Sequence, residues 1–259
     1  MENNLNKITN DNNLTQLNNA GNLTQTGILT SVGKYGSNED HEPFIDNNLF
    51  FPLADMLVDP LHSLGLTPND VTYIGTVFTF LTIYFLEKKN KKLAVASYLF
   101  GYILDCVDGK MARKYNEGSN FGMVLDNTSD TLSNVVLLVY ILYRFNLKQK
   151  NFNILIVLII LLFIFSYSYS LNEAILSYNK YGDDNFYKYK EKDLDGKWNN
   201  STEEVLYKYY LSYHKELYNT YRNLFPTYDE NNIKKWLHVL KEFGPGTFNI
   251  VSAYFIYNL

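Results

Sequence analysis

Four aspartates stand close together in the sequence, in two pairs whose spacing is helical. Asp105 and Asp108 are three residues apart, and Asp126 and Asp130 are four residues apart. On a helix, residues at these separations lie on one face, so each pair would point in one direction. The short connection over residues 109–121 would make two such helices antiparallel neighbours. The spacing therefore predicts that four carboxylates meet at one place.

Carboxylates that converge repel one another and need a neutralising partner. One aspartate at the centre of a membrane helix costs about 2.5–3.5 kcal/mol, and mutual repulsion adds to that cost. Two divalent cations would cancel the charge of the four side chains, and oxygen ligands favour Mg²⁺ or Mn²⁺ over zinc. The carboxylates alone do not identify the reaction, because a structural network or an ion-transport path in a membrane would use the same residues.

Apolar runs long enough to form helices must position these aspartates. The first, second and fifth runs reach the ~20 residues of a membrane span only with their polar flanks, whereas the fourth has no polar face at all. We predict an all-α integral membrane protein, a bundle of five transmembrane helices. Buried helices of a soluble all-α protein are the alternative. The five runs are Val71–Leu86, Leu93–Val107, Phe121–Tyr143, Asn153–Leu171 and Phe243–Leu259.

Polar and amphipathic segments frame the apolar runs. Residues 1–48 are rich in Asn and have no apolar period, so they cannot offset their ordering entropy by burial, which predicts a disordered tail. Asn48–Leu66 has leucines at helical spacing, which predicts an N-terminal amphipathic helix lying at the membrane interface. Residues 49–259 would then form one membrane domain, with a polar insertion at about 172–241. Within the insertion we expect a loop over Asp183–Asn200 and a helix over Glu203–Phe225.

Composition excludes some classes of protein. The net charge of −4 and the absence of a basic footprint argue against nucleic-acid binding. The single cysteine, Cys106, excludes an internal disulfide framework. The four histidines have no metal-ligand spacing, and we expect all of them at the surface: they are His41, His62, His214 and His238.

The residues between the aspartates complete a longer pattern, D-x-x-D-G-x-x-A-R-x8-G-x3-D-x3-D, over Asp105–Asp130. This pattern resembles the signature of the CDP-alcohol phosphotransferase family (class-I CDP-alcohol phosphatidyltransferases), and every fixed position is filled. An Asp-rich prenyltransferase would instead need D-D-x-x-D or N-D-x-x-D. That alternative would not explain Gly109, Ala112 and Arg113.

The resemblance implies a membrane-embedded transferase of phospholipid biosynthesis. Such an enzyme moves a substituted phosphate group from a CDP-alcohol to an acceptor alcohol and releases CMP. By the same resemblance, the four aspartates hold two Mg²⁺ or Mn²⁺ ions, and Asp130 is also the candidate general base for the acceptor hydroxyl. The remaining signature residues would contact the CDP-alcohol, and they are Gly109, Ala112, Arg113 and Gly122.

The entry to the first apolar run carries a second, shorter resemblance. The segment TPNDVTYIG, residues 67–75, is similar to the P-N-x-x-T-x-x-G entry to the family's first membrane helix. This likeness implies that Asn69 and Thr72 help to line the nucleotide pocket. The alternative is an ordinary helix start, with Pro68 in the first turn and Asn69 or Asp70 as the cap.

The resemblance leaves part of the function open. The family usually has six membrane helices against five apolar runs here, so the alternative function is a catalytically impaired protein that keeps the fold as a binding or scaffold module. Flanking Lys and Arg residues are equally numerous on both sides and do not orient the chain. CDP-alcohols are made in the cytosol, so the resemblance places the active site there. Its implied partners are the CDP-alcohol, an alcohol or lipid acceptor and the lipid bilayer, with a homodimer left open.

Overall fold

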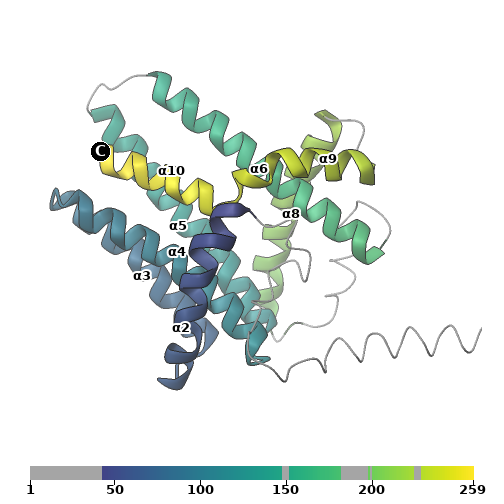
Figure 1. The fold of residues 1–259 in the computed structure, drawn as a ribbon, viewed down its shortest axis with the longest axis horizontal. Helices are drawn as coiled ribbons and strands as arrows, with labels where there is room; N and C mark the ends of the chain where they lie inside the picture. The colour runs from purple at the N-terminus through teal and green to yellow at the C-terminus, as the bar shows by residue number, and fades with distance from the viewer. Residues whose placement is uncertain (1–42, 148–151, 182–197, 199, 225–228) are drawn as a thin grey trace, which may run out of the picture. The chain divides into compact units, whose positions relative to one another are not determined.

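The computed structural model describes residues 43–147, 152–181, 198, 200–224 and 229–259, and the regular structure of these ranges is entirely helical (Figure 1). The predicted all-α class is confirmed. Among the residues described, no helix combines the length and the apolarity that a membrane crossing requires. All five predicted apolar runs lie in helices. That these helices cross a membrane stays a prediction.

The predicted amphipathic segment forms two consecutive helices, the short π-helix η3 (Asp46–Phe50) and α2 (Phe51–Ser63). Phe50, Ala54 and Val58 recur every four residues and are buried, whereas Met56 is 72% exposed. The amphipathic helix is thus confirmed, but helical structure begins earlier than predicted. Residues 44–48, which the predicted tail included, are already helical, and residues 1–42 lie outside the described part of the chain.

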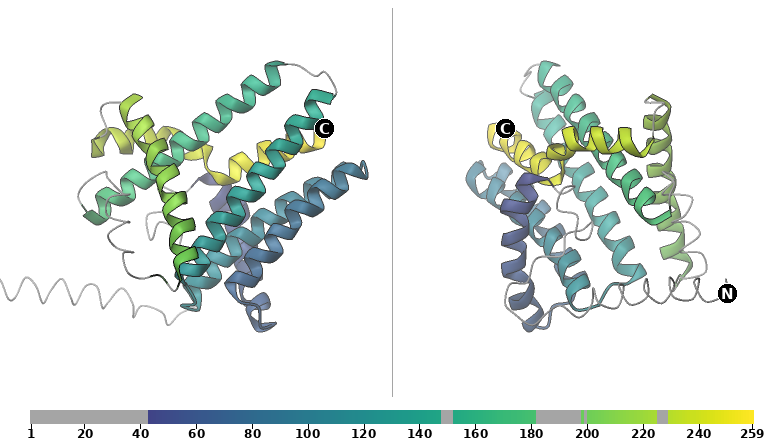
Figure 2. Two further views of the ribbon diagram at one scale, coloured as in Figure 1. Left: turned by 180° about the vertical axis from the view of Figure 1, so that it is seen from behind. Right: turned by 45° about the vertical axis from the view of Figure 1, so that its right-hand side comes forward.

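Helices α3 (Pro68–Glu87) and α4 (Lys91–Lys114) form a closely packed hairpin, visible in Figures 1 and 2. Gly65 separates α2 from α3 with φ of +83°, a left-handed conformation that glycine adopts without steric cost. Asn90 begins α4 by accepting a hydrogen bond from the Leu93 N–H at 3.2 Å. Local capping signals therefore set where the first helices begin and end.

Ion pairs hold α2 along the C-terminal half of α4. Lys110 Nζ lies 2.8 Å from Asp55 Oδ1, and one turn further Lys114 pairs with Asp59. The hydroxyl of Tyr115 also donates to Asp59 at 2.7 Å. The hydrogen bonds from Lys114 and Tyr115 hold the pKa of Asp59 below its usual value. Because both pairs advance in the same direction, α2 and this half of α4 run parallel.

The later apolar runs fall on long helices, with differences at their ends. The apolar run predicted over Asn153–Leu171 lies in α6, which extends beyond Leu171 to Tyr181. Ala174 and Ile175 are buried in this extension, which explains why Ser, Tyr and Asn residues around them remain helical. The helices are α5 (Asn120–Leu147), α6 (Phe152–Tyr181) and α10 (Pro245–Asn258), the last preceded by the 3₁₀-helix η4 (Lys241–Phe243).

The insertion contains two helices, of which one was predicted. Helix α8 (Ser201–Leu224) confirms the predicted helix, whereas α9 (Glu230–Leu240) was missed. The signal for α9 is present, because Asp229 is its N-cap and accepts a hydrogen bond from the Asn232 N–H at 3.0 Å. The predicted loop over Asp183–Asn200 lies almost entirely outside the residues described.

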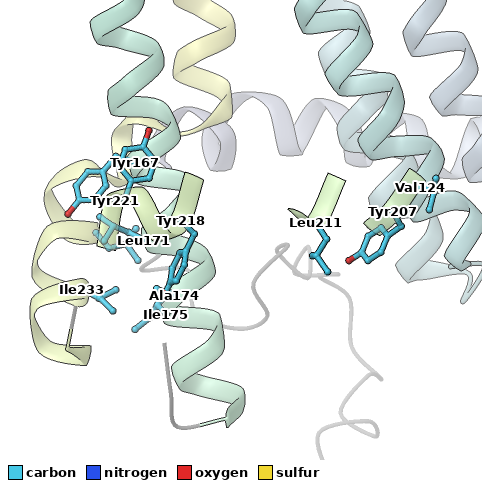
Figure 3. Close-up of a cluster of buried hydrophobic side chains, with 11 residues drawn as sticks. Val124, Tyr167, Leu171, Ala174, Ile175, Tyr207, Leu211, Tyr218, Tyr221 and Ile233 are labelled. Atoms are coloured by element: carbon cyan, nitrogen blue, oxygen red, sulfur yellow. The ribbon is translucent and has the colours of Figure 1, made fainter. Parts of the chain in front are cut away.

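A buried cluster fastens α8 to the rest of the chain (Figure 3). Near the C-terminal end of α8, Tyr218 packs with Leu171 of α6 and Ile233 of α9. Nearer its N-terminus, Tyr207 lies against Val124 of α5. Helix α8 therefore joins α6 and α9 to α5, which carries two of the four aspartates.

A buried carboxylate ties the N-terminal helix to α4 and α10. Asp46 is 1% exposed, and it accepts hydrogen bonds from the hydroxyl of Tyr102 and from the Gly246 N–H at 3.0 Å. A Cβ atom at Gly246 would lie 2.6 Å from Asp46 Oδ1, so only glycine leaves room for this carboxylate. The sequence prediction missed the residue because it placed Asp46 in the tail.

We expect Asp46→Ala to lower the free energy of unfolding by about 3 kcal/mol, because two donors would lose a charged acceptor worth about 1.5–3 kcal/mol each. Thermal unfolding of the purified protein would show the loss as a lower midpoint. Asn48→Ala is the matched control in the same helix, since it removes an exposed bond to the Phe44 carbonyl and should cost at most about 0.5 kcal/mol. Equal midpoints for the two variants would contradict the role assigned to Asp46.

Candidate active site

The two aspartate pairs face each other between α4 and α5. Asp105 and Asp108 lie on α4, and Asp126 and Asp130 lie on α5. Carboxylate oxygens of Asp105, Asp108 and Asp126 all lie within 4.8 Å of one another. Asp130 lies beside Asp105, which is near enough to influence its protonation. The structure thus brings all four residues together, as their helical spacing predicts.

Helix α3 packs beside the aspartates and contacts one of them. It packs against both α4 and α5, whereas α4 and α5 have little direct contact with each other. The two aspartate helices are nonetheless neighbours, because their carboxylates meet in the space between the two backbones. Thr72 of α3 donates a hydrogen bond to Asp108 Oδ2 at 2.6 Å, and Asp108 is only 5% exposed. Thr72 thus fixes the orientation of the most buried carboxylate.

A cavity of about 330 Å³ opens onto the aspartates, and residues of α3, α4, α5, α6, α8 and α10 line it. All four aspartates are among its lining residues. Asp130 is exposed in this cavity, whereas Asp108 is buried. Asp130 is therefore the carboxylate that a molecule in the cavity reaches most directly.

Two glycines allow α3 and α4 to approach closely beside the cavity. A Cβ atom at Gly101 would lie 3.3 Å from the Cβ of Phe78 and 3.4 Å from the carbonyl oxygen of Gly75. Both glycines also line the cavity. A Cβ atom at Gly101 would therefore force its neighbours to shift slightly, whereas a Cβ atom at Gly75 would make ordinary van der Waals contacts at 3.5 and 3.6 Å.

Gly109, Ala112 and Arg113, which follow Asp108 on α4, are not among the residues that line the cavity. Arg113 is exposed, and its guanidinium covers Gly109, where an added Cβ would lie 3.3 Å from Nη1. Ala112 is half-buried on the same turn of α4. The resemblance implies that these residues contact the CDP-alcohol, and in this structure the space beside Gly109 holds the Arg113 side chain.

The sequence left open whether the start of α3 lines the pocket or is an ordinary capped helix start, and the structure shows features of both. Thr67 is the N-cap, and Asp70 completes a capping box by accepting from the Thr67 N–H at 2.9 Å. Asn69 is therefore free of the capping role and lies against Gly122 of α5, where an added Cβ would be 2.9 Å from its Oδ1. Thr72 lines the cavity, and Asn69 and Gly122 pack together beside it.

The cavity also contains a histidine that the sequence analysis assigned to the surface. His214 of α8 is half-buried and lines the cavity, with its ring centroid 4.2 Å from that of Tyr210. His62 is 31% exposed, which agrees with the surface prediction, and its ring stacks on that of Tyr115 with centroids 3.5 Å apart. His238 is exposed as predicted, and residue 41 lies outside the described ranges.

We expect Thr72→Val to weaken divalent-cation binding by about 10–100-fold, because it removes the hydrogen bond that orients Asp108 while keeping the shape of the side chain. Titration of Mn²⁺, followed by electron paramagnetic resonance, measures the affinity. Thr82→Val is the matched control, since Thr82 is also buried and its hydroxyl bonds only to the Phe78 carbonyl of its own helix. If both variants bind Mn²⁺ like the parent protein, Thr72 has no orienting role.

The clustered carboxylates fit a divalent cation. They offer oxygen ligands only, which is the donor set that Mg²⁺, Mn²⁺ and Ca²⁺ prefer. The distances among Asp105, Asp108 and Asp126 allow one ion to contact all three side chains. Asp130, beside Asp105, offers a further oxygen ligand at the cavity surface.

Fold and site together describe an all-helical protein with a carboxylate-lined cavity suited to divalent cations. Residues 65–190 match the model of the CDP-alcohol phosphatidyltransferase family. This segment contains every signature residue from Asn69 to Asp130 and carries the chain's similarity to that family.

Similar proteins of known name agree with this match. The chain is 42% identical over 78 residues to an archaetidylinositol phosphate synthase of Pyrococcus horikoshii. The aligned segment covers 30% of this chain and 42% of the relative. It is 32% identical over 102 residues to a phosphatidylinositol phosphate synthase of Mycobacterium tuberculosis, with coverage of 39% and 47%. A CDP-diacylglycerol–inositol 3-phosphatidyltransferase of Saccharomyces cerevisiae is 32% identical over 84 residues, with coverage of 32% and 38%.

The chain spans less than half the length of each of these three relatives. No solved structure is significantly similar to the chain.

Proposed function

We propose that this chain is a membrane-embedded CDP-alcohol phosphotransferase that moves a substituted phosphate group to an acceptor alcohol and releases CMP. One observation carries the proposal: the four signature aspartates converge on a single cavity, with three carboxylates within 4.8 Å of one another. The family match and the names of the relatives support a role in phospholipid synthesis.

Each part of the site has a proposed task. Asp105, Asp108 and Asp126 hold Mg²⁺ or Mn²⁺, and Asp130 completes a site for two ions. When bound, these ions stabilise negative charge on the diphosphate of the donor. Thr72 orients Asp108 through its hydrogen bond of 2.6 Å.

The signature residues around the cavity would bind the CDP-alcohol. Arg113 presents a planar guanidinium suited to a phosphate group. The small residues Gly109 and Gly122 leave room for the side chains of Arg113 and Asn69, which are proposed to contact the donor, and Ala112 is proposed to lie in the same binding region. These residues are close to the aspartates in the sequence of α4 and α5 or at the start of α3, and we place the nucleotide end of the donor against them.

In the proposed reaction, the oxygen of an acceptor hydroxyl attacks the phosphorus that carries the donor's alcohol. A new P–O bond forms while the bond to the bridging oxygen breaks, and CMP leaves with that oxygen. The proton of the hydroxyl passes to a carboxylate oxygen of Asp130, which is exposed in the cavity and therefore within reach of the acceptor. The product is a phosphodiester.

Exposed apolar side chains support a place in a bilayer. Helix α3 exposes Val77 and Phe80 at 54% and 52%, and α6 exposes Ile159 and Ile160 at 55% and 51%. Soluble monomers rarely expose contiguous apolar patches of this kind. We therefore place the chain in a membrane as a multi-pass protein with α2 at the interface. The family resemblance, through a donor made in the cytosol, supports an active site on the cytosolic side.

The names of the relatives indicate which donors and acceptors should be tested first. They point to CDP-diacylglycerol or a related lipid donor, and to inositol or an inositol phosphate as acceptor. The comparisons do not support the alternative of an impaired protein that serves only as a scaffold.

A screen of donors against acceptors tests the proposal. The full chain, purified and placed in lipid vesicles with Mg²⁺ or Mn²⁺, would be given CDP-diacylglycerol, CDP-choline or CDP-ethanolamine together with polyols or diacylglycerol. We expect CMP release with at least one pair and only when an acceptor is present. Absence of CMP release for every pair with both metals would refute the proposed activity.

A further inference from the structure

Helix α8 of the insertion presents two adjacent stripes of side chains. Tyr207, Leu211 and Tyr218 form one stripe, and they are buried in the cluster that fastens α8 to its neighbours (Figure 3). Tyr210 and His214, one turn apart, form a second stripe with Leu217, and all three line the cavity. The same helix that anchors the insertion therefore forms part of the wall of the aspartate cavity.

Neutral polar groups from other helices surround this part of α8 in the cavity lining. Tyr169 and Ser166 of α6 and Asn249 of α10 line the cavity with His214. The His214 ring lies 4.2 Å from the ring of Tyr210 and 5.8 Å from that of Tyr169, measured between centroids. Hydroxyl, amide and imidazole groups can each exchange hydrogen bonds with an alcohol, because an alcohol both donates and accepts.

The aspartates and the α8 wall provide two different kinds of surface in one cavity. The carboxylates, with their cations, suit the charged diphosphate of the donor. An acceptor whose reacting hydroxyl reaches Asp130 must place its other groups against the remaining lining. That lining includes the polar side chains of α6, α8 and α10.

We propose that Tyr210 and His214 of α8, with Tyr169 of α6, form the acceptor-binding part of the cavity and select an uncharged polyol. This inference rests on the proposed transferase function and assigns a role to the insertion. His214 is a specificity-determining residue, because it contacts the acceptor and lies on a different helix from the four aspartates.

Two substitutions at His214 test the inference. His214→Leu removes the hydrogen-bonding group, and we expect the KM for inositol, used as the neutral polyol, to rise about 10-fold, with the affinity for Mn²⁺ and the KM for CDP-diacylglycerol unchanged. His214→Gln keeps a hydrogen-bonding group and should recover part of the affinity. Tyr209→Leu is the control on the same helix, because Tyr209 is 79% exposed and is not among the cavity-lining residues.

The outcomes separate the inference from the proposed function. An unchanged KM for inositol in His214→Leu would overturn the role of α8 while leaving the transferase activity intact. A higher kcat/KM for an inositol phosphate than for inositol would overturn the choice of an uncharged acceptor. Calorimetric titration of the parent protein with inositol gives a readout that needs no turnover. Absence of binding at millimolar inositol, with CDP-diacylglycerol and Mg²⁺ present, would also overturn the inference.

Discussion

Asp130→Asn should reduce CMP release by about 10²–10⁴-fold, the range that a positioned general base contributes. An amide of the same size cannot take the proton of the acceptor hydroxyl, but it leaves the shape of the cavity unchanged. Asp105, Asp108 and Asp126 remain within 4.8 Å of one another, so the donor and at least one cation should still bind. Turnover measured by CMP release, together with a binding titration of the CDP-alcohol, checks both parts of this expectation.

Asp229→Asn provides the control for this substitution. Asp229 caps α9, is exposed and is not among the cavity-lining residues, and asparagine caps a helix as well as aspartate does. Its turnover should equal that of the parent protein. Full activity in Asp130→Asn would exclude Asp130 as the base and would move that role to another group of the cavity.

Asp108→Asn should have a comparably large effect through cation binding. Loss of an outer-sphere partner alone weakens a metal site by about 10–100-fold, so loss of a charged ligand should weaken Mn²⁺ binding by more than about 100-fold. The amide oxygen can still accept the hydrogen bond from Thr72, which keeps α3 and α4 in place. Electron paramagnetic resonance titration with Mn²⁺ measures the change directly.

Two further measurements make the Asp108 result specific. The thermal midpoint of Asp108→Asn should remain close to that of the parent protein, because the contact with Thr72 survives. Raising the Mg²⁺ concentration should restore part of the CMP release if weak cation binding causes the loss. Unaltered Mn²⁺ affinity in this variant would mean that Asp108 does not belong to the cation site.

Features that depend on neighbours in the sequence were predictable. The apolar runs located α3, α4, α5, α6 and α10, because helical period and apolar content are local properties. The convergence of the aspartates followed from separations of three and four residues on two helices joined by a short connection. The same local pattern gave α8, whose apolar positions recur at helical spacing.

Features that depend on distant segments were not predictable from these patterns. Asp46 accepts a hydrogen bond from Gly246, 200 residues away in the sequence, and no local signal marks either residue as a partner. The cavity position of His214 follows from the way α8 packs on α5 and α6. In the sequence, this position is indicated only by a second row of side chains on α8, beside the row that is buried. The placement of Arg113 over Gly109 depends on the rotamer of a long side chain, which spacing does not determine.

The central claim is that the four aspartates form a site for two divalent cations beside a nucleotide diphosphate. Diffraction from crystals grown with Mn²⁺ and CDP-diacylglycerol, recorded at the manganese absorption edge, tests it most directly. We expect two anomalous peaks between Asp105, Asp108, Asp126 and Asp130, with oxygen ligands at about 2.0–2.2 Å. Manganese bound elsewhere, or a nucleotide in the cavity with no ion beside these carboxylates, would contradict the claim.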